Sequence, residues 1–158
     1  MIDYKNLRVV VVTGLKDYLG CLVTRSNQNI KPPAYPYVSY SIITPMSENN
    51  GTYGEYEDSI ARKPVTITFS FTAISDDNEE SLMLANKAKE YLDYVGTVHL
   101  NDNGVIVQST TNVTNRDNFI TTEYQYRNGF DCVFWSYDEI DKSDFGQETI
   151  ETVDFVED

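Results

Sequence analysis

The sequence is poor in the residues on which catalytic and metal sites depend. It contains one histidine, His99, and two cysteines, Cys21 and Cys132, that stand far apart. A Ser-His or Cys-His nucleophile would have to use His99, and metal sites built from Cys and His need several ligands. The phosphate-binding patterns GxGxxG and GxxxxGKS/T are missing as well. We therefore expect a protein that is no enzyme and uses no metal and no cofactor, with both thiols buried and reduced.

Basic residues and long apolar runs are also scarce. Twelve Lys and Arg stand against 25 Asp and Glu, which gives the 158 residues a net charge of -13. Because phosphate binding depends on Lys and Arg, a sequence-specific reader of DNA or RNA is disfavoured. The longest aliphatic run, Val9 to Val12, is far shorter than the roughly 18 residues of a membrane span, and the N-terminus lacks the features of a secretory signal. We expect a soluble protein, made in the cytoplasm and without membrane contact.

Two segments have the spacing and the end signals of helices. In residues 3–20, apolar side chains recur at the i, i+3, i+4 and i+7 positions of one buried face. Asp3 can cap the first turn of this helix, and Gly20 suits a left-handed residue at its end. Residues 76–96 combine a capping-box pattern with a second periodic stretch. We expect both helices to cover the same face of a sheet.

Strands are predicted where apolar and polar residues alternate or β-branched residues cluster. The clearest alternation runs over residues 63–75, and Pro45 is expected to end an earlier strand over residues 35–44. Shorter strands are expected at residues 21–24, 98–100 and 105–113. The order α-β-β-α-β-β predicts an α+β two-layer sandwich, in which a mainly antiparallel sheet carries two helices on one face.

The longest strand-like segment spans residues 117–137. Almost all of it is β-branched, aromatic or alternating polar, and a single strand of this length would extend about 65 Å, far beyond the usual strand. Its one interruption, Asn128-Gly129, is either a hairpin turn or a bulge within a continuing strand, and its RNGFD context favours the bulge. Either form supplies main-chain edges for assembly and no evident chemistry. The segment therefore predicts an interaction protein before an enzyme.

Two acidic regions lie beside the predicted strands. Residues 46–61 read as a Gly-punctuated hairpin loop, and a loop of this length is usually functional or disordered. Its carboxylates are Glu48, Glu55, Glu57 and Asp58. They could bind a cation or serve a small hydrolase or nuclease, but we expect them to be solvated or to face a partner. Residues 138–158 carry nine Asp or Glu against one Lys, typical of a solvated terminus. We expect one domain over residues 1–137, followed by an acidic tail.

Seven motifs spread over most of residues 4–137 carry a family resemblance. The most specific are NNGTYG in the loop at 46–61 and RNGFDCVFW in the 117–137 segment. The others are YKNLRVVVVTGLKDYLG, PPAYPYVSYSIITPM, EDSIARKPVT, NDNGVIVQ and TNRDNF. Together these motifs resemble those of phage tail terminators, close to the group called neck terminator proteins.

The resemblance implies a structural protein of the virion, located in the tail-neck region. Tail terminators are α/β subunits that assemble, usually as a hexameric ring, on the head-proximal end of a completed tail tube, end its polymerisation and form a docking face for the head connector. The implied partners are further copies of the chain, the tail tube protein, the head-completion or connector protein and, in a contractile tail, the sheath, while DNA passes through the lumen without specific binding. The family has no catalytic residues. The alternative is another head-tail joining protein, such as a head-completion or stopper protein.

The surfaces that would build such a ring are expected at residues 121–126 and 130–135, with the loop at 46–61 reaching a neighbour, the tube or the connector. Charged residues along the 117–137 segment either pair across a subunit boundary and set the strand register, or decorate the solvent face of one chain. Both interpretations stay open. The candidate interface residues are Tyr53, Glu55, Tyr56, Glu57, Arg116, Glu123, Tyr124, Tyr126, Arg127, Asp131 and Trp135.

Overall fold

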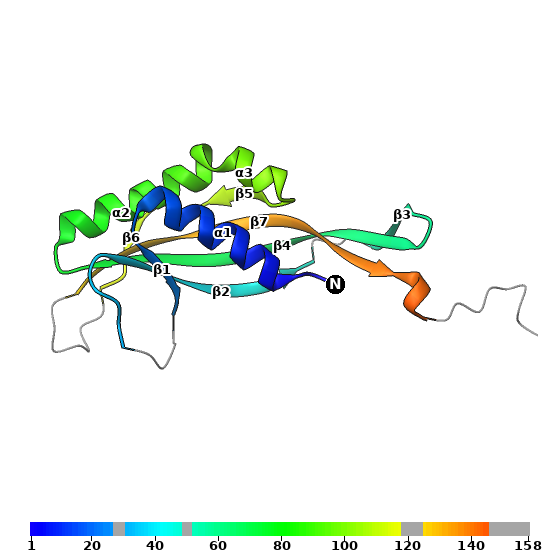
Figure 1. The fold of residues 1–158 in the computed structure, drawn as a ribbon, viewed down its shortest axis with the longest axis horizontal. Helices are drawn as coiled ribbons and strands as arrows, with labels where there is room; N and C mark the ends of the chain where they lie inside the picture. Colours follow the sequence, from blue (N-terminus) through cyan, green and yellow to red (C-terminus); the bar gives the residue numbers. More distant parts are fainter. Residues whose placement is uncertain (27–30, 49–51, 118–124, 146–158) are drawn as a thin grey trace, which may run out of the picture.

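A computed structural model describes residues 1–26, 31–48, 52–117 and 125–145, which form a seven-stranded sheet with three α-helices (Figure 1). The helices are α1 (Tyr4–Leu19), α2 (Asn78–Glu90) and α3 (Thr97–Asp102), with a π-helical turn, Tyr91–Val95, before α3 and a 3-10 turn, Lys142–Phe145, after the last strand. The strands are β1 (Leu22–Arg25), β2 (Tyr37–Ser47), β3 (Gly54–Glu57), β4 (Ile60–Ser75), β5 (Ile106–Thr110), β6 (Thr114–Asn115) and β7 (Tyr126–Asp141).

The sheet is built around two strands of unusual length. Its order is β1-β2-β4-β7-β5, with β3 paired to β4 and β6 to β7. β4 and β7 each have 16 residues and pair antiparallel along their whole lengths, from Ile60 opposite Asp141 to Ser75 opposite Tyr126. Only the pair β1 and β2 is parallel among the described strands. The predicted α+β two-layer fold with a mainly antiparallel sheet is confirmed.

The hydrophobic core fills the space between one face of the sheet and the helices α1 and α2. Alternate residues of the central strands point to this face because side chains in a strand have a period of two. Phe69 is fully buried at its centre, with ring centroids 6.0 Å from Tyr40, 5.9 Å from Phe71 and 5.2 Å from Phe134. The helices contribute Leu7, Val10, Val11, Leu15, Leu19, Leu84, Ala85 and Ala88 to the same cluster.

The predicted helix ends are confirmed by their caps. The carboxylate of Asp3 accepts a hydrogen bond from the backbone N–H of Asn6 at 3.0 Å, and Gly20 adopts a left-handed conformation with φ 68°. Asp77 caps α2 through the N–H of Glu79. These short-range interactions explain why the ends of both helices were visible in the sequence.

Three of the local predictions are wrong. Residues 98–100, expected as a strand, belong to α3, where Leu100 alone is buried and His99 lies on a helix; a short apolar run does not distinguish a helix turn from a strand. Pro45 does not end β2, because the strand continues to Ser47 through irregular pairing after Ile42, and such irregular pairing tolerates proline. The loop at 46–61 contains β3, and β4 begins at Ile60 rather than at residue 63.

The interpretation of Asn128-Gly129 as a turn or bulge is also wrong. Both residues lie inside β7 and pair with Ala73 and Thr72 of β4 without a shift in register. A Cβ at position 129 would lie 2.3 Å from the carbonyl oxygen of Phe71. Glycine is therefore used here for a close approach of two strands and not for a turn.

The neighbouring asparagine ties β7 to α2. Asn128 is buried, and its amide donates to the hydroxyl of Ser81 at 3.0 Å and to the side chain of Asn78 at 3.4 Å. Ser81 in turn donates to the backbone carbonyl of Ala73 at 2.8 Å. This buried network is satisfied throughout, as a buried polar group requires, and it sets the position of α2 on the two central strands.

Candidate assembly interface

The outer ends of β4 and β7 extend beyond the helices as an arm. We define the arm as residues 53–66, which contain β3 and the first part of β4, together with residues 135–141 of β7; Figure 1 shows it reaching well past α1 and α3. The buried cluster under the helices ends at Ile67 and Phe134. Beyond these two residues the strands continue pairing without helical cover. The arm is held by its own side chains and by contacts with Glu48 and with the N-terminal amine of Met1.

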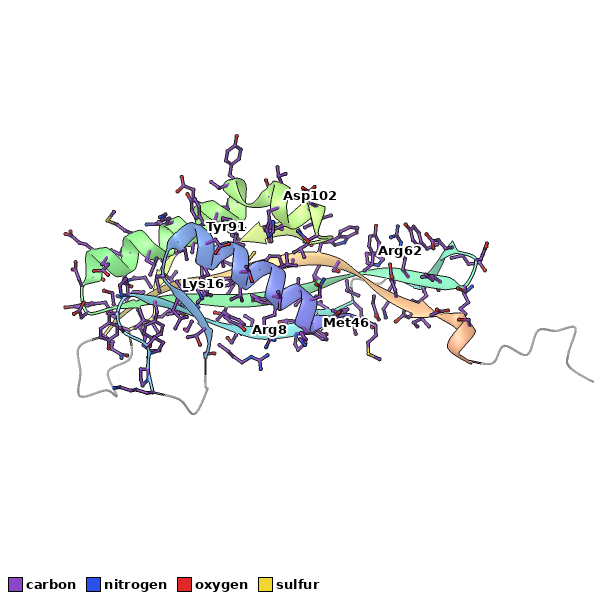
Figure 2. All side chains as sticks on the ribbon, in the orientation of Figure 1. Arg8, Lys16, Met46, Arg62, Tyr91 and Asp102 are labelled. Carbon is purple, nitrogen blue, oxygen red and sulfur yellow. The ribbon has the colours of Figure 1, made fainter. Side chains whose placement is uncertain are left out.

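The outer part of the arm is held together by aromatic rings around one guanidinium. The Cζ atom of Arg62 lies 3.4 Å from the ring centroid of Tyr56 and 3.8 Å from that of Tyr137 (Figure 2). Tyr137 packs edge-on against Trp135, with ring centroids 4.6 Å apart. Cation–π contacts at exposed sites contribute about 0.5–1 kcal/mol each. Residues of β3, β4 and β7 therefore hold the arm as a single unit.

The base of the arm contains a buried charged cluster. Lys63 is 7% exposed, and its ammonium lies 2.5 Å from the carboxylate of Glu48 and 4.5 Å from the ring centroid of Tyr53. The hydrogen bond to Glu48 raises the pKa of Lys63. Tyr53 donates its hydroxyl proton to Asp138. Burial raises the pKa of Asp138, but the hydrogen bond from Tyr53 and the nearby positive charges outweigh burial, and the pKa is lowered.

The tip of the arm exposes carboxylates to solvent. Glu55, Glu57 and Asp58 are all exposed, and Glu55 lies 3.3 Å from the ammonium of Lys142. Within residues 1–26, 31–48, 52–117 and 125–145, no group of three or more His, Cys, Asp or Glu side chains is arranged to hold a metal ion. This geometry is that of a solvated turn and gives no support to a hydrolase built on these carboxylates.

A second group of predicted residues lies on the sheet face opposite the helices. Arg116 forms an ion pair with Asp131 at 2.9 Å and donates to the hydroxyl of Ser70. Its side chain crosses β7 directly over Gly129, where a Cβ would lie 3.0 Å from the Cδ and Nη1 atoms of Arg116. The charges of Arg116 and Asp131 therefore pair within one chain, in line with the second of the two interpretations that the sequence left open.

Comparison with known proteins identifies the family. A family model described as phage neck terminator protein matches residues 9–158. The chain belongs to this family. The match includes the acidic C-terminal residues 138–158, which lie outside the motifs that suggested the resemblance. The expected tail-terminator relationship is thereby confirmed, and with it a head-tail joining role in the neck region of a phage.

Other comparisons add little to the description of this neck terminator. No protein with a curated description matches the chain. Among the solved structures that match, one covers 87% of this chain and 97% of its own, at 12% sequence identity and a TM-score of 0.43, a likeness too low to carry an argument. No helix among the described residues is long and apolar enough to cross a membrane.

The neck terminator places its predicted interface residues in two separate regions. Tyr53, Glu55, Tyr56, Glu57 and Trp135 come together on the arm, whereas Arg116, Tyr126, Arg127 and Asp131 lie at the other end of β7, on the body. The backbone N–H of Arg127 donates a hydrogen bond to the carboxylate of Asp117 at 2.6 Å. Glu123 and Tyr124 lie outside the described residues. Their role at an interface stays a prediction.

Sequence reasoning missed the cross-strand partners within the arm. Arg62, Lys63, Tyr137 and Asp138 are central to its packing, yet none was among the candidates. Lys63 faces Asp138 only because β4 and β7 pair in one particular register, and register is not visible in either strand alone. The predicted boundary after residue 137 falls inside β7, so Asp138 belongs to the arm; the acidic tail remains a prediction for residues 146–158.

Proposed function

We propose that this neck terminator assembles as a ring of six copies on the head-proximal end of the tail tube. The ring ends polymerisation of the tube and presents the surface to which the head connector, or a head-completion protein, binds. In a contractile tail the sheath would be a further partner. Membership of the family supports the neck location and the head-tail joining role, and the physical argument for ring assembly comes from the arm.

A closed ring needs two different surfaces on each subunit that bind head to tail. The arm supports this proposal because it extends past the helix-covered body and exposes aromatic and charged side chains to contact by another chain. The outer strands β1 and β5 add two sheet edges to which a partner strand can pair. A subunit of this shape offers distinct surfaces for a neighbour on each side.

The net charge fits the passage of DNA through the ring. Six copies at -13 each carry 6 × -13, or -78, formal charges. Carboxylates facing the lumen would repel phosphates and keep DNA from binding as it is ejected. We propose that DNA threads the lumen without specific contacts. A structure of the assembled ring with a lumen dominated by Lys and Arg would contradict this part of the proposal.

The decisive experiment is electron microscopy of particles assembled without this protein. Loss of termination should give tails of unregulated length beside filled, tailless heads, and expression of the wild-type protein in trans should restore normal particles. Tails of normal length in its absence would show that termination resides in another protein. Tails of normal length that fail only to join heads would point instead to a head-completion or stopper role.

A further inference from the structure

The charges of this acidic protein are unevenly distributed over its surface. α1 and β1 together contain four cations, Lys5, Arg8, Lys16 and Arg25, and one anion, Asp17. The helix repeat places Lys5 and Lys16 on one face of α1 together with Val9, whereas Arg8 precedes the buried Leu15 by seven residues and lies on the side nearer the core. A net positive helix is unexpected in a chain of net charge -13, and it calls for an explanation beyond solubility.

The face that carries Lys5 and Lys16 points away from the core. Lys5 and Lys16 are exposed and Arg8 is half-buried, while Leu7, Val11 and Leu15 face the sheet. Figure 2 marks Arg8 and Lys16 on this helix. None of the three cations forms an ion pair with any residue that the structure describes.

One apolar side chain accompanies the two lysines. Val9, on the same face of α1, is 48% exposed. A helix face that combines unpaired cations with an exposed aliphatic side chain has the composition of a protein contact, with an apolar centre and charged residues around it. We call this surface, formed by Lys5, Val9 and Lys16, the α1 face.

The arm has the complementary charge. Its strands and turn expose the acids Glu55, Glu57, Asp58, Glu139 and Asp141 and contain two cations, Arg62 and Lys63, while Lys142, directly after β7, pairs with Glu55. Both cations are engaged internally, Arg62 between two tyrosine rings and Lys63 with Glu48. The charge that the arm presents outward is therefore carried mainly by carboxylates, next to the exposed ring of Tyr56.

We propose that the arm of one copy docks on the α1 face of the next copy around the ring. This inference rests on the proposed ring assembly and names the two surfaces that form its interface. Within one chain the arm tip points away from α1 (Figure 1), so the two surfaces meet only between copies. Each subunit would give one arm and receive one, which is the head-to-tail arrangement that closes a ring. Opposite charges steer the approach and fix the orientation.

Charge reversal tests the contact directly. One variant carries Lys5→Glu and Lys16→Glu, and the other carries Glu55→Lys, Glu57→Lys and Asp58→Lys. Each variant alone places like charges together, which should lower incorporation into particles at least about tenfold. Co-expressed in equal amounts, the two variants can alternate around the ring because six is an even number. Every interface of such a ring then joins opposite charges, and incorporation should return to within about twofold of wild type.

The matched control reverses two exposed acids elsewhere, Glu90→Lys and Asp102→Lys, and should be incorporated normally. Circular dichroism melts establish that all variants fold, since exposed substitutions usually change stability by no more than about 0.5 kcal/mol. If the arm and α1 variants are each incorporated as well as wild type, the proposal is wrong. It is equally wrong if both fail alone and the mixture also fails, which would assign the two surfaces to the tube or the connector.

An engineered disulfide between two copies tests the contact between the arm and the α1 face independently of any measurement of tail length. Val9→Cys and Glu57→Cys are placed on separate molecules in a Cys21→Ser background, mixed at high concentration and oxidised. A crosslink should form between the two variants, fall as salt rises, and be weak within either variant alone. Absence of the mixed crosslink in assembled particles would overturn the inference. The two experiments can also disagree. If the crosslink forms between the variants but particles assembled without the protein have tails of normal length, the contact between copies is real and the proposed function is wrong.

Discussion

The substitution Gly129→Ala tests the close packing of the two central strands. Position 129 lies in the middle of β7, opposite Thr72, and its backbone does not have positive φ. The added methyl group would lie 2.3 Å from the carbonyl oxygen of Phe71 and 3.0 Å from the Arg116 side chain. The first contact involves backbone on both sides, so it cannot be relieved by rotating a side chain.

The expected cost follows from these contacts. To restore an ordinary separation, the carbonyl of Phe71 must move by about 1 Å within the most extensively paired strands of the sheet, and overpacking of this kind costs about 1–3 kcal/mol. The Arg116–Asp131 pair would also be displaced, but both side chains are about one third exposed, so its loss adds only about 0.5 kcal/mol. We expect a total near 3 kcal/mol, which lowers the Tm of a domain of this size by about 6–12 °C.

Urea denaturation followed by circular dichroism would measure the change, with thermal melts as a second probe. The control is Gly54→Ala on β3, where the nearest atom to the added methyl group would be the carbonyl oxygen of Arg62 at 4.0 Å. This control should leave stability unchanged or slightly higher, since alanine restricts the unfolded chain. If Gly129→Ala unfolds within about 0.5 kcal/mol of Gly54→Ala, the argument for a close strand approach at this position is refuted.

Three further predictions concern buried polar and titratable groups. Asn128→Ala should lower stability by about 1–3 kcal/mol, because the hydroxyl of Ser81 loses its buried donor. Tyr53→Phe should lower the free energy of unfolding by about 1 kcal/mol at neutral pH, because it removes the hydrogen bond to Asp138. The pKa of Asp138 is lowered below 3.8 in the folded state. The difference in stability should therefore persist above pH 3.8 and vanish as the pH falls through the lowered value. Burial strongly raises the pKa of the Cys132 thiol, so a thiol reagent should label it only on unfolding.

Each of these predictions has a control on the same chain. Asn112→Ala alters an exposed asparagine and should leave urea denaturation unchanged, whereas equal losses for both asparagines would remove the case for the buried network. Tyr56→Phe removes a hydroxyl that bonds to no described residue, so a pH-dependent loss there as large as for Tyr53→Phe would contradict the role of Asp138. Labelling of Cys132 is measured in the Cys21→Ser background, and rapid reaction under native conditions would show that the core is open.

The helices and the central strand could be predicted because their signals are local. Asp3, Gly20 and Asp77 act on backbone groups within one turn of their own positions, and the alternation of residues 63–75 repeats every second residue. Residues 98–100 could not be assigned in this way. Three residues with one buried side chain fit a helix turn and a strand equally well, and the packing of Leu100 beneath α3 decides between them.

The candidate interface was predicted in part. The loop at 46–61 and the segment at 117–137 were singled out for their length and composition, and both contribute to the arm through β3 and β7. The partners of these segments were missed, because Arg62 meets Tyr137 only across a strand pair. The ion pair of Arg116 and Asp131 illustrates the same limit, since sequence alone left open whether the two charges meet within one chain or between two.

The sequence by itself determined the two longer helices, α1 and α2, the alternating central strand and, through its motifs, the phage neck terminator family. These properties depend on residues that are close together in the sequence, or on short motifs that can be read from it directly. Tertiary structure alone decided that Asn128 and Gly129 lie within a continuous strand and that Asp138 is buried. It also decided that β4 and β7 extend beyond the helices to form an arm. Each of these depends on the register between strands far apart in the chain, which is set by how all their side chains pack together.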